Sequence, residues 1–522
     1  MPERPLLPLW AAVPTAAVAG VALDGALPSL GWWPLAFVSV TLGLLTLIGR
    51  RIGGSVLVGF AYGLCFFFPN ISWISQFLGD MPLGWLPWVA LAVLESAILA
   101  AITPLITLAY RWVPRWRDTR GVRLGVLPVL VAGLWTAREL VLGSWPYGGF
   151  PWGRLGMTQS ESPFATVASW VGISGLSFLM VLLCALVVEA IRWTARTTKA
   201  PGEGDSPAVR GVKALMPSFA LVLLMMVIPQ FPTTPAGSIR VGAAQGNGPT
   251  AFVDERRAFD VVNSQLEASQ PLETERVDVV LWPEGGVDGD PINNQQLAAI
   301  LDAAAARYHA PILMNAASAD GDLVYNTSFL WTENGAVAQH SKRHPVPFGE
   351  YIPDREFYGT LVPDLVNLVG REYSAGTNPP IVNVDGTTIG LAICFDVVFD
   401  DVPREAVLNG AQVYMLQTNN ADFRGSDENL QQLAFAKMRA IETGRSVVNL
   451  STTGTSQVFG PDGTTVDSLP IDEAGLMIVD VELRDGLTPA MVIGPTVQLV
   501  LLWGSVLALA VLGVLSRRTT AV

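Results

Sequence analysis

The chain is poor in the residues from which cross-links and metal sites are built, with three cysteines and three histidines in 522 residues. Two of the cysteines, Cys65 and Cys184, fall within long apolar segments, so Cys394 has no plausible disulfide partner. No group of His, Cys and carboxylate residues has the spacing of a zinc site. The histidines do not form a recognisable Cys-His-Asn arrangement either. The sequence therefore excludes a disulfide framework, and we expect no metal.

Charge is also scarce, because only 15% of the residues are Asp, Glu, Lys or Arg, where a soluble chain carries about a quarter. Apolar stretches long enough to cross a bilayer account for this deficit. Eight spans are expected, at residues 8–23, 32–48, 55–74, 85–110, 124–142, 171–193, 214–228 and 493–515. The first is interrupted by Pro14 and Asp24, and a cleaved signal peptide is the competing interpretation of that segment. The absence of a convincing cleavage site disfavours that alternative.

Basic residues are absent from the loops 25–31 and 76–83 and concentrated in the alternate loops. Those loops carry Arg50, Arg51, Arg111, Arg115, Arg117, Arg120, Arg123, Arg192, Arg196, Lys199, Arg210, Lys213, Arg517 and Arg518. Cytoplasmic loops are the ones enriched in Lys and Arg. We therefore expect both termini in the cytoplasm and residues 230–490 outside the membrane.

This external segment changes the character of the sequence, and three parts are predicted: residues 1–230, a membrane domain with seven helices; residues 231–490, an external domain; and residues 491–522, a final span with its tail. In the external part, short β-rich runs alternate with amphipathic helices, as in an α/β domain. Strands are expected at 240–245, 277–282, 311–316, 323–331, 388–394, 413–417, 446–450 and 475–481. Helices are expected at 253–269, 293–308, 402–409 and 429–443.

The net charge is −13, and most carboxylates lie in the external segment. Nucleic acid is therefore not expected as a partner, because phosphate binding requires clustered Lys and Arg. One stretch of this segment, 357–369, is rich in Phe, Tyr, Leu and Val. It is compatible both with a loop that dips into the lipid surface and with an ordinary helix packed on the domain.

Three residues of the external segment form a possible acyl-transfer site. Cys394 ends an apolar strand, where a nucleophile can be presented at a turn; a buried inert thiol is the alternative. Glu284 follows another apolar strand, where a general base is often found, although a turn-capping carboxylate looks the same. Lys342 precedes a proline-stiffened run and could lower a thiol pKa or stabilise an oxyanion, although lysines are most often simply surface residues.

Charged residues also fall deep within the predicted spans. Glu95, Arg138 and Glu139 are costly in lipid and usually face a bundle interior or a polar cavity. They are compatible with a path for lipid headgroups, and Arg138 and Glu139 equally with a structural pair.

Glu284, Lys342 and Cys394, in this order and roughly fifty residues apart, resemble the Glu-Lys-Cys triad of the nitrilase superfamily. The neighbouring Gln245-Gly-Asn247, Asn326-Thr-Ser and Arg439-Ala-Ile-Glu-Thr-Gly-Arg445 agree with it. With the eight spans, the Pro347-Phe-Gly-Glu-Tyr-Ile-Pro353 block and the Phe-Pro-Trp152 loop, nearly the whole chain resembles the apolipoprotein N-acyltransferase family, which acts last in bacterial lipoprotein maturation.

The resemblance implies a fold, a polytopic helical membrane domain with an extracytoplasmic α-β-β-α sandwich, and a location in the bacterial plasma membrane. It assigns Glu284 as the base, Lys342 as the oxyanion stabiliser and Cys394 as the nucleophile. Glu350 matches a second functional carboxylate, and Phe395 and Asp396 replace the Tyr and Glu that often follow the cysteine. The nearest aromatic to a functional Trp of the family is Phe252. Further predicted substrate contacts are Trp152, Phe357, Tyr358, Asn419 and Asn420.

The implied reaction moves an acyl chain from a phospholipid to Cys394 and then to the α-amine of a diacylated lipoprotein, and it requires no cofactor. A membrane-anchored amidase or nitrilase-type hydrolase would use the same three residues with water as the acceptor. A transporter or receptor with an external binding domain is a further alternative, but it leaves Cys394 unexplained.

Overall fold

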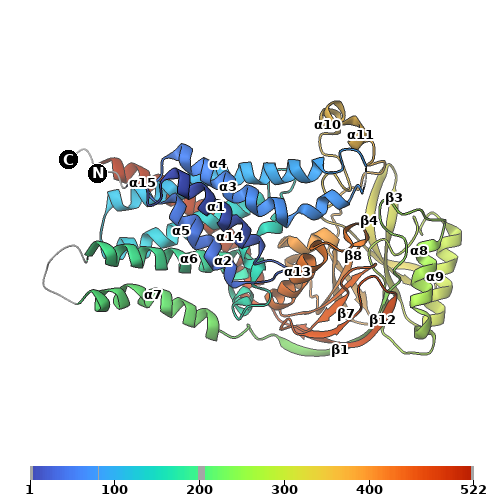
Figure 1. The fold of residues 1–522 in the computed structure, drawn as a ribbon. Helices are drawn as coiled ribbons and strands as arrows, with labels where there is room; N and C mark the ends of the chain where they lie inside the picture. Colours follow the sequence, from blue (N-terminus) through green and yellow to red (C-terminus); the bar gives the residue numbers. More distant parts are fainter. Residues whose placement is uncertain (1–3, 80, 198–205, 519–522) are drawn as a thin grey trace. The chain divides into compact units, whose positions relative to one another are not determined.

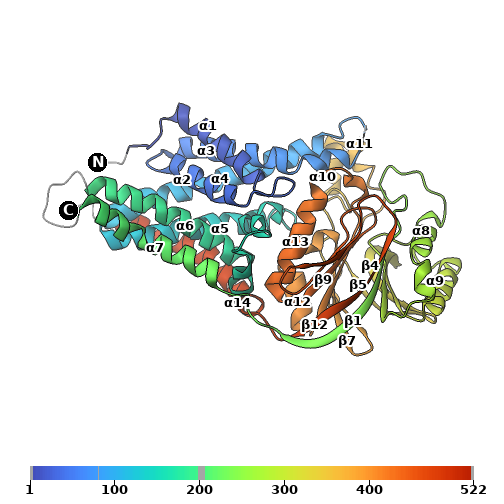
Figure 2. The same ribbon diagram turned by 60° about the horizontal axis from the view of Figure 1, so that its bottom comes forward.

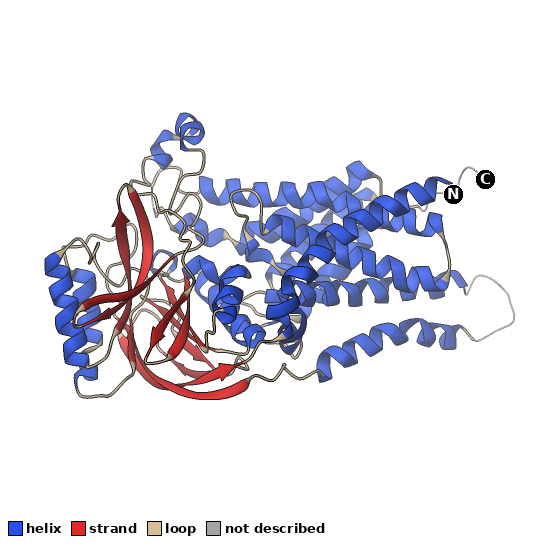
Figure 3. Ribbon diagram, turned by 180° about the vertical axis from the view of Figure 1, so that it is seen from behind, coloured by secondary structure: helices blue, strands red, loops and turns tan. Residues whose placement is uncertain are grey.

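The computed structural model describes residues 4–79, 81–197 and 206–518, which fall into two compact units (Figure 1). The helical unit comprises Met1–Ser75, Pro82–Pro229 and Val492–Val522, and the α/β unit comprises Gln76–Met81 and Gln230–Met491. Lys199, one of the basic residues used to orient the chain, lies outside the described residues. Figure 3 shows that the β-strands belong to the α/β unit alone.

The eight expected spans are all helical among the described residues. The helices concerned are α1 (Leu9–Asp24), α2 (Pro34–Leu47), α3 (Ile52–Asn70), α4 (Leu86–Trp116), α5 (Leu127–Leu142), α6 (Ala168–Thr197), α7 (Pro207–Val227), α14 (Pro489–Leu499) and α15 (Ser505–Arg518). In the part of the chain that the structure describes, six helical stretches are long and apolar enough to cross a membrane, the last formed by α14, the π-helix Val500–Gly504 and α15. At 1.5 Å per residue α1 and α2 reach only about 24 and 21 Å, short of the roughly 30 Å of a hydrocarbon core.

Small residues allow α3 and α4 to approach closely. A Cβ atom added to Gly63 would lie 2.9 Å from the Cα of Ser96, and one added to Gly59 would lie 2.6 Å from the hydroxyl oxygen of Thr103. Two glycines four residues apart on one helix face are a common contact between apolar helices, because the backbones can then pack against each other. An alanine at either position would push the two helices apart.

The α/β unit is built on two six-stranded sheets. In one, the order is β12 (Gly475–Asp485), β1 (Thr234–Gln245), β2 (Val279–Leu281), β3 (Ile312–Asp320), β4 (Leu323–Thr332) and β5 (Gly335–Ser341). In the other, it is β11 (Thr465–Ser468), β10 (Gln457–Phe459), β9 (Ser446–Ser451), β8 (Val413–Thr418), β7 (Thr387–Ile393) and β6 (Ile381–Val384). Strands β1, β2 and β3 run parallel, as do β7, β8 and β9.

Apolar side chains of the two sheets meet in one core, in which Val279 and Leu281 of β2 pack with Ile389 and Leu391 of β7. The alternate residues of the first sheet face α8 (Asp260–Ala268) and α9 (Gln295–Tyr308), as Val280 does. Helices α12 (Asp401–Leu408) and α13 (Glu428–Thr443) cover the second sheet. Figure 2 shows these layers in the order helix, sheet, sheet, helix.

The sequence-based boundaries differ from the structure where the chain turns or where a strand lies at a sheet edge. The helix expected at 253–269 begins only at Asp260, because the Asp254 carboxylate accepts the Ala251 N–H at 2.9 Å and holds the preceding residues in a turn. The edge strands β5, β6 and β11, and also β10 beside β11, were not predicted. In β11 the side chains are mostly exposed, so the sequence shows no alternating apolar pattern.

The apolar stretch 357–369 forms two short helices, α10 (Arg355–Leu361) and α11 (Pro363–Val366). No residue of α10 is buried, and Phe357 and Leu361 are 59% and 60% exposed. Tyr358 packs edge-on against Phe348, with ring centroids 4.9 Å apart. An ordinary helix packed on the domain would bury its apolar side chains, and α10 does not.

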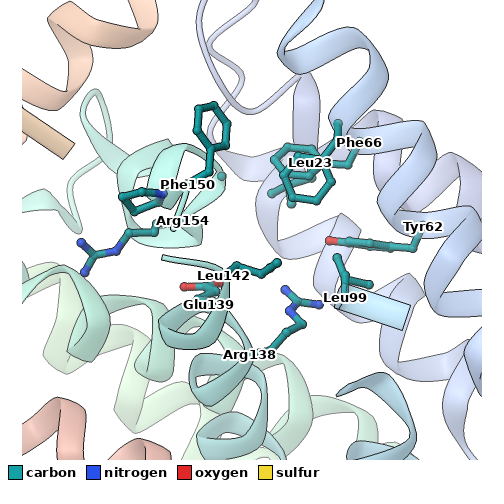
Figure 4. Close-up of a pocket in the computed structure, with 12 residues that line it drawn as sticks. Leu23, Tyr62, Phe66, Leu99, Arg138, Glu139, Leu142, Phe150 and Arg154 are labelled. Atoms are coloured by element: carbon teal, nitrogen blue, oxygen red, sulfur yellow. The ribbon is translucent and has the colours of Figure 1, made fainter. Parts of the chain in front are cut away.

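Arg138 and Glu139 of α5 line a small cavity within the helical unit, with Tyr62, Leu23 and Arg154 (Figure 4). They do not form a direct ion pair. The Arg138 guanidinium lies 4.0 Å from the centre of the Trp135 ring, and the indole N–H of Trp135 donates to Glu139 Oε1 at 3.1 Å. Trp135 therefore connects the two charges, because residues three and four positions apart share a helix face.

Candidate active site

The three predicted catalytic residues follow three different strands at the same edge of the α/β unit. Glu284 lies in the turn after β2, Lys342 directly follows β5, and Cys394 directly follows β7. Because β2 and β5 point in the same direction within their sheet, their carboxyl ends lie at one edge. The ends of parallel strands commonly carry the functional groups of α/β proteins.

The ammonium group of Lys342 lies between two carboxylates. Its Nζ is 3.0 Å from Glu350 Oε1 and 3.3 Å from Glu284 Oε1. The lysine is 1% exposed, and a buried charge requires such partners. The adjacent backbone is held as well, because the Lys342 N–H donates to the Asn326 carbonyl at 2.8 Å.

Asn326 of β4 connects the same two carboxylates from the other side. Its Nδ2 donates to Glu284 Oε1 at 2.8 Å and to Glu350 Oε1 at 3.1 Å. Its Oδ1 accepts from Asn315 Nδ2 at 2.7 Å, and Asn315 Oδ1 in turn accepts the Gly285 N–H at 2.8 Å. The backbone N–H of Gly285 therefore fixes the orientation of both amides.

The two carboxylates differ in what remains available for chemistry. Glu350 uses Oε1 for Lys342 and Asn326, and its Oε2 accepts the Val346 N–H at 2.7 Å. Glu284 uses only Oε1, so among the described residues its Oε2 has no hydrogen-bond partner. Lys342 makes two of the three bonds its ammonium can donate. One carboxylate oxygen and one ammonium proton are thus left for a substrate.

Cys394 occupies a tight turn between β7 and a short 3₁₀ helix, Cys394–Val398. Its φ of +48° lies in the left-handed region, which residues other than glycine seldom adopt. Strained turns of this kind occur at functional sites, where they present a side chain at the end of a strand. The residue as a whole is half-buried, and its sulfur accepts a hydrogen bond from Gln432 Nε2 at 3.4 Å.

Burial and neighbouring charges set the protonation states. Burial raises the pKa of the Cys394 thiol well above its usual value, and the charge of Glu284 raises it further, against the opposing effect of Lys342. Burial likewise raises the pKa of Glu284. Despite burial, the two carboxylates hold the pKa of Lys342 well above its ordinary value. The resting site therefore contains a thiol, a charged lysine and a carboxylate of increased basicity.

Asp396 connects the cysteine turn to the lysine segment, although its own side chain is completely buried. Its carboxylate accepts the backbone N–H groups of His344 at 2.8 Å, of Arg343 at 3.3 Å and of Ile393 at 3.3 Å. The Asp396 side chain, which is shorter than the Glu often found at this position, thus positions the backbone on both sides of the site. Phe395 is buried and packs edge-on against Phe399, with ring centroids 5.1 Å apart.

The predicted substrate contacts lie in different surroundings. Phe252 is 42% exposed and stacks on Phe77 of the Gln76–Met81 segment, 5.4 Å between centroids. Asn419 accepts from the Thr250 and Thr452 hydroxyls, at 3.1 and 2.7 Å. Asn420 is buried, with 1% of its surface exposed.

Two further predicted contacts, Phe357 and Tyr358, are on α10, and their place in substrate binding stays a prediction. Trp152 belongs to the helical unit, where it is 2% exposed between Trp73 and Phe150.

Sequence reasoning missed Asn315, Gln432 and Glu428. Asn315 lies on an otherwise apolar strand, β3, where a polar residue among buried ones was the available signal. Gln432 and Glu428 lie four residues apart on α13 and share its buried face. In the sequence, polar residues at this spacing look the same whether the helix face is buried or solvated. Among the described residues, no group of three His, Cys, Asp or Glu side chains is arranged to hold a metal ion.

Comparison with known proteins agrees with both units. Residues 19–186 match the family model for the apolipoprotein N-acyltransferase N-terminal domain, and residues 240–486 match that for carbon-nitrogen hydrolases. Among solved structures, an amidase of the nitrilase superfamily from Nesterenkonia is 19% identical, with a TM-score of 0.36 over 48% of this chain and 92% of that one.

Curated relatives match along almost the whole chain. The apolipoprotein N-acyltransferase of Mycolicibacterium smegmatis is 32% identical over 94% of this chain and 83% of its own length. That of Azotobacter vinelandii is 29% identical, over 92% and 91%. The fold and the matches define a membrane protein with a nitrilase-like domain. More specifically, the chain belongs to the apolipoprotein N-acyltransferase family.

Proposed function

We propose that this protein transfers a fatty acyl chain from a membrane phospholipid to the α-amine of the N-terminal S-diacylglyceryl-cysteine of lipoproteins. Membership of the family supports the activity. The observation that carries the assignment of residues is the buried Glu284–Lys342–Glu350 cluster, which leaves one oxygen of Glu284 and one proton of Lys342 uncommitted beside the strained turn of Cys394.

In the first half of the proposed reaction, Glu284 Oε2 takes the proton of the Cys394 thiol. The thiolate attacks the carbonyl carbon of the acyl ester, and Lys342 stabilises the oxyanion of the tetrahedral intermediate. When the intermediate collapses, the carbon–oxygen bond to the glycerol breaks. Glu284 returns the proton to the leaving oxygen, so a lysophospholipid departs and an acyl-thioester remains.

In the second half, the neutral α-amine of the acceptor attacks the thioester carbon. Glu284 accepts a proton from the attacking nitrogen, and the carbon–sulfur bond breaks. The sulfur regains the proton, which leaves an amide and the resting thiol. A thioester is converted to a more stable amide, so no external energy source and no cofactor are required.

The proposed arrangement in the membrane has eight spans, with α1 and α2 as two of them. The domains run from 1 to 230, from 231 to 490 and from 491 to 522, with both termini in the cytoplasm of a bacterium and the α/β unit outside. The basic residues of alternate loops support this orientation. The exposed Phe357 and Leu361 of α10 suit contact with a lipid surface.

An amidase or nitrilase-type hydrolase remains the second candidate, because water could discharge the same thioester. Exposed apolar side chains on α10 and the long apolar helices favour a lipid substrate over a small amide.

To test this proposal, detergent-purified protein is incubated with phospholipid and a diacylated cysteinyl lipopeptide. The mass of the lipopeptide is then measured by mass spectrometry. The proposal expects the mass of one additional acyl chain, absent with Cys394→Ala. An unmodified lipopeptide that a known family member still acylates would reject the transferase and favour the hydrolase.

A further inference from the structure

A line of hydrogen bonds inside the α/β unit ends on the sulfur of Cys394. The Gly454 N–H donates to Ser451 Oγ at 2.9 Å, and Ser451 Oγ donates to Asn420 Oδ1 at 2.7 Å. Asn420 Nδ2 donates to Gln432 Oε1 at 2.9 Å, and Gln432 Nε2 reaches Cys394 Sγ at 3.4 Å. The end of β9, the loops that follow β8 and β9, the turn of Cys394 and α13 thus contribute to one continuous path.

The Gly454 N–H occupies one lone pair of Ser451 Oγ, and the serine hydroxyl donates its proton to Asn420 Oδ1. The Thr418 hydroxyl lies 3.2 Å from the same Asn420 oxygen and 3.3 Å from the Leu450 carbonyl oxygen, so it can donate to either. With its oxygen occupied, Asn420 can turn only its NH₂ group toward Gln432, whose own NH₂ group then faces the sulfur. Asn420, Gln432 and Ser451 are at most 2% exposed, so water cannot substitute for these bonds.

A second branch leads to a buried acid on the same helix. Asn420 Nδ2 also donates to Glu428 Oε2 at 2.7 Å, and Glu428 is 2% exposed. Burial raises the pKa of Glu428 to about 8, so this carboxyl is mostly protonated at neutral pH. Among the charges near the thiol, Glu284, Glu428 and Glu350 disfavour its ionised form and Lys342 favours it.

We infer that Gln432 is a positioning residue for the nucleophile. Its amide N–H stabilises the Cys394 thiolate whenever Glu284 holds the proton of the thiol. Hydrogen bonds to a charged acceptor are stronger than neutral ones, and aligned donors polarise one another. The bond is therefore strongest when the sulfur is negative, before attack on the ester and again when the sulfur leaves. This inference rests on the proposed role of Cys394.

The test compares the full-length protein with Gln432→Met, which keeps the side-chain length and removes the donor. Alkylation of Cys394 by iodoacetamide is followed from pH 6 to 10 by mass spectrometry of the peptide that contains it, which separates it from Cys65 and Cys184. We expect alkylation about ten- to a hundredfold slower near neutrality, and a profile displaced to higher pH. Gln432→Glu is expected to be slower still at high pH, because a carboxylate then faces the thiolate.

The neighbouring buried glutamine provides the control, since Gln431→Met removes an amide from the same helix turn. The alkylation profile of Gln431→Met should match that of the wild-type protein. A wild-type profile for Gln432→Met would overturn the inference, and so would an equal slowing by Gln431→Met. If Cys394→Ala still acylates the lipopeptide, the proposed role of Cys394 as the nucleophile fails instead, whatever the alkylation profiles show.

Discussion

Two buried groups of charged residues, one in each unit, satisfy their polar atoms very differently. In the α/β unit, Lys342 lies between Glu284 and Glu350, and Asn326 bonds both carboxylates. In the helical unit, Arg138 Nε and Glu139 Oε2 have no hydrogen-bond partner among the described residues. They border a cavity of about 20 Å³, enough for one water molecule.

The proposed function makes the first group a site held for chemistry, and we interpret the second group as one held for packing. A network in which nearly every polar atom is bonded has one geometry, and the few atoms it leaves uncommitted are held in fixed positions. Around Lys342 these atoms are one oxygen and one proton, placed by amides whose orientation starts at the Gly285 backbone. Around Arg138 the organising element is the Trp135 ring, which tolerates displacement better than a directed bond.

The largest effect is expected from the base. Glu284→Gln retains an oxygen for Lys342 and Asn326 but cannot take a proton, so thioester formation should slow by roughly 10²–10⁴-fold. Glu350→Gln should slow it less, by about tenfold, because Glu350 carries no proton in the proposed reaction and the change costs mainly the hydrogen bond from the Val346 N–H. Single-turnover acylation of Cys394 by phospholipid measures both variants. A larger loss for Glu350→Gln would reverse the two roles.

A smaller effect, visible in the pH profile, is expected from Asn326→Leu. The Asn326 N–H bond lowers the pKa of Glu284, which burial raises. Activity requires the deprotonated base, so it is present above that pKa and lost as pH falls through it. Removing the bond raises the pKa further and moves the acidic limb of the rate profile to higher pH. An unchanged acidic limb in a folded variant would show that Asn326 does not act on Glu284.

The smallest effect is expected in the helical unit. Trp135→Phe keeps a ring beneath Arg138 and removes only the N–H bond to Glu139, a loss of about 1 kcal/mol. Thermal unfolding in detergent should show a decrease of about 2–4 °C, and acyl transfer at low temperature should be unaffected. Trp135→Leu, which also removes the ring, should be less stable. If Trp135→Phe instead abolished transfer, the helical cluster would have a role beyond packing.

Much of the fold could be predicted because apolar length and alternation are local properties. The long helices and central strands β7, β8 and β9 are mostly apolar, and their predicted positions agree with the structure to within a few residues. Edge strand β11 has exposed side chains and no such pattern. The start of α8 depends on the Asp254 turn, which a helical period cannot reveal.

The candidate site was predictable only in part for a related reason. Glu284, Lys342 and Cys394 each follow a strand, and the order of the three is visible in the sequence. The amides of Asn315 and Gln432 act through contacts between segments far apart in the chain, Gln432 being 38 positions from Cys394. The Val346 N–H donates to the second oxygen of Glu350, so Glu284 is the carboxylate that keeps one oxygen free. This bond depends on the folded backbone and cannot be read from the sequence.

The most direct test of the account is the mass of the peptide containing Cys394 after the protein meets phospholipid without an acceptor. The account predicts one acyl chain on Cys394, removed by neutral hydroxylamine and discharged when a diacylated lipopeptide is added. The account would be contradicted if the lipopeptide became N-acylated while Cys394 stayed unmodified at every time point, and if the Cys394→Ala variant also acylated it.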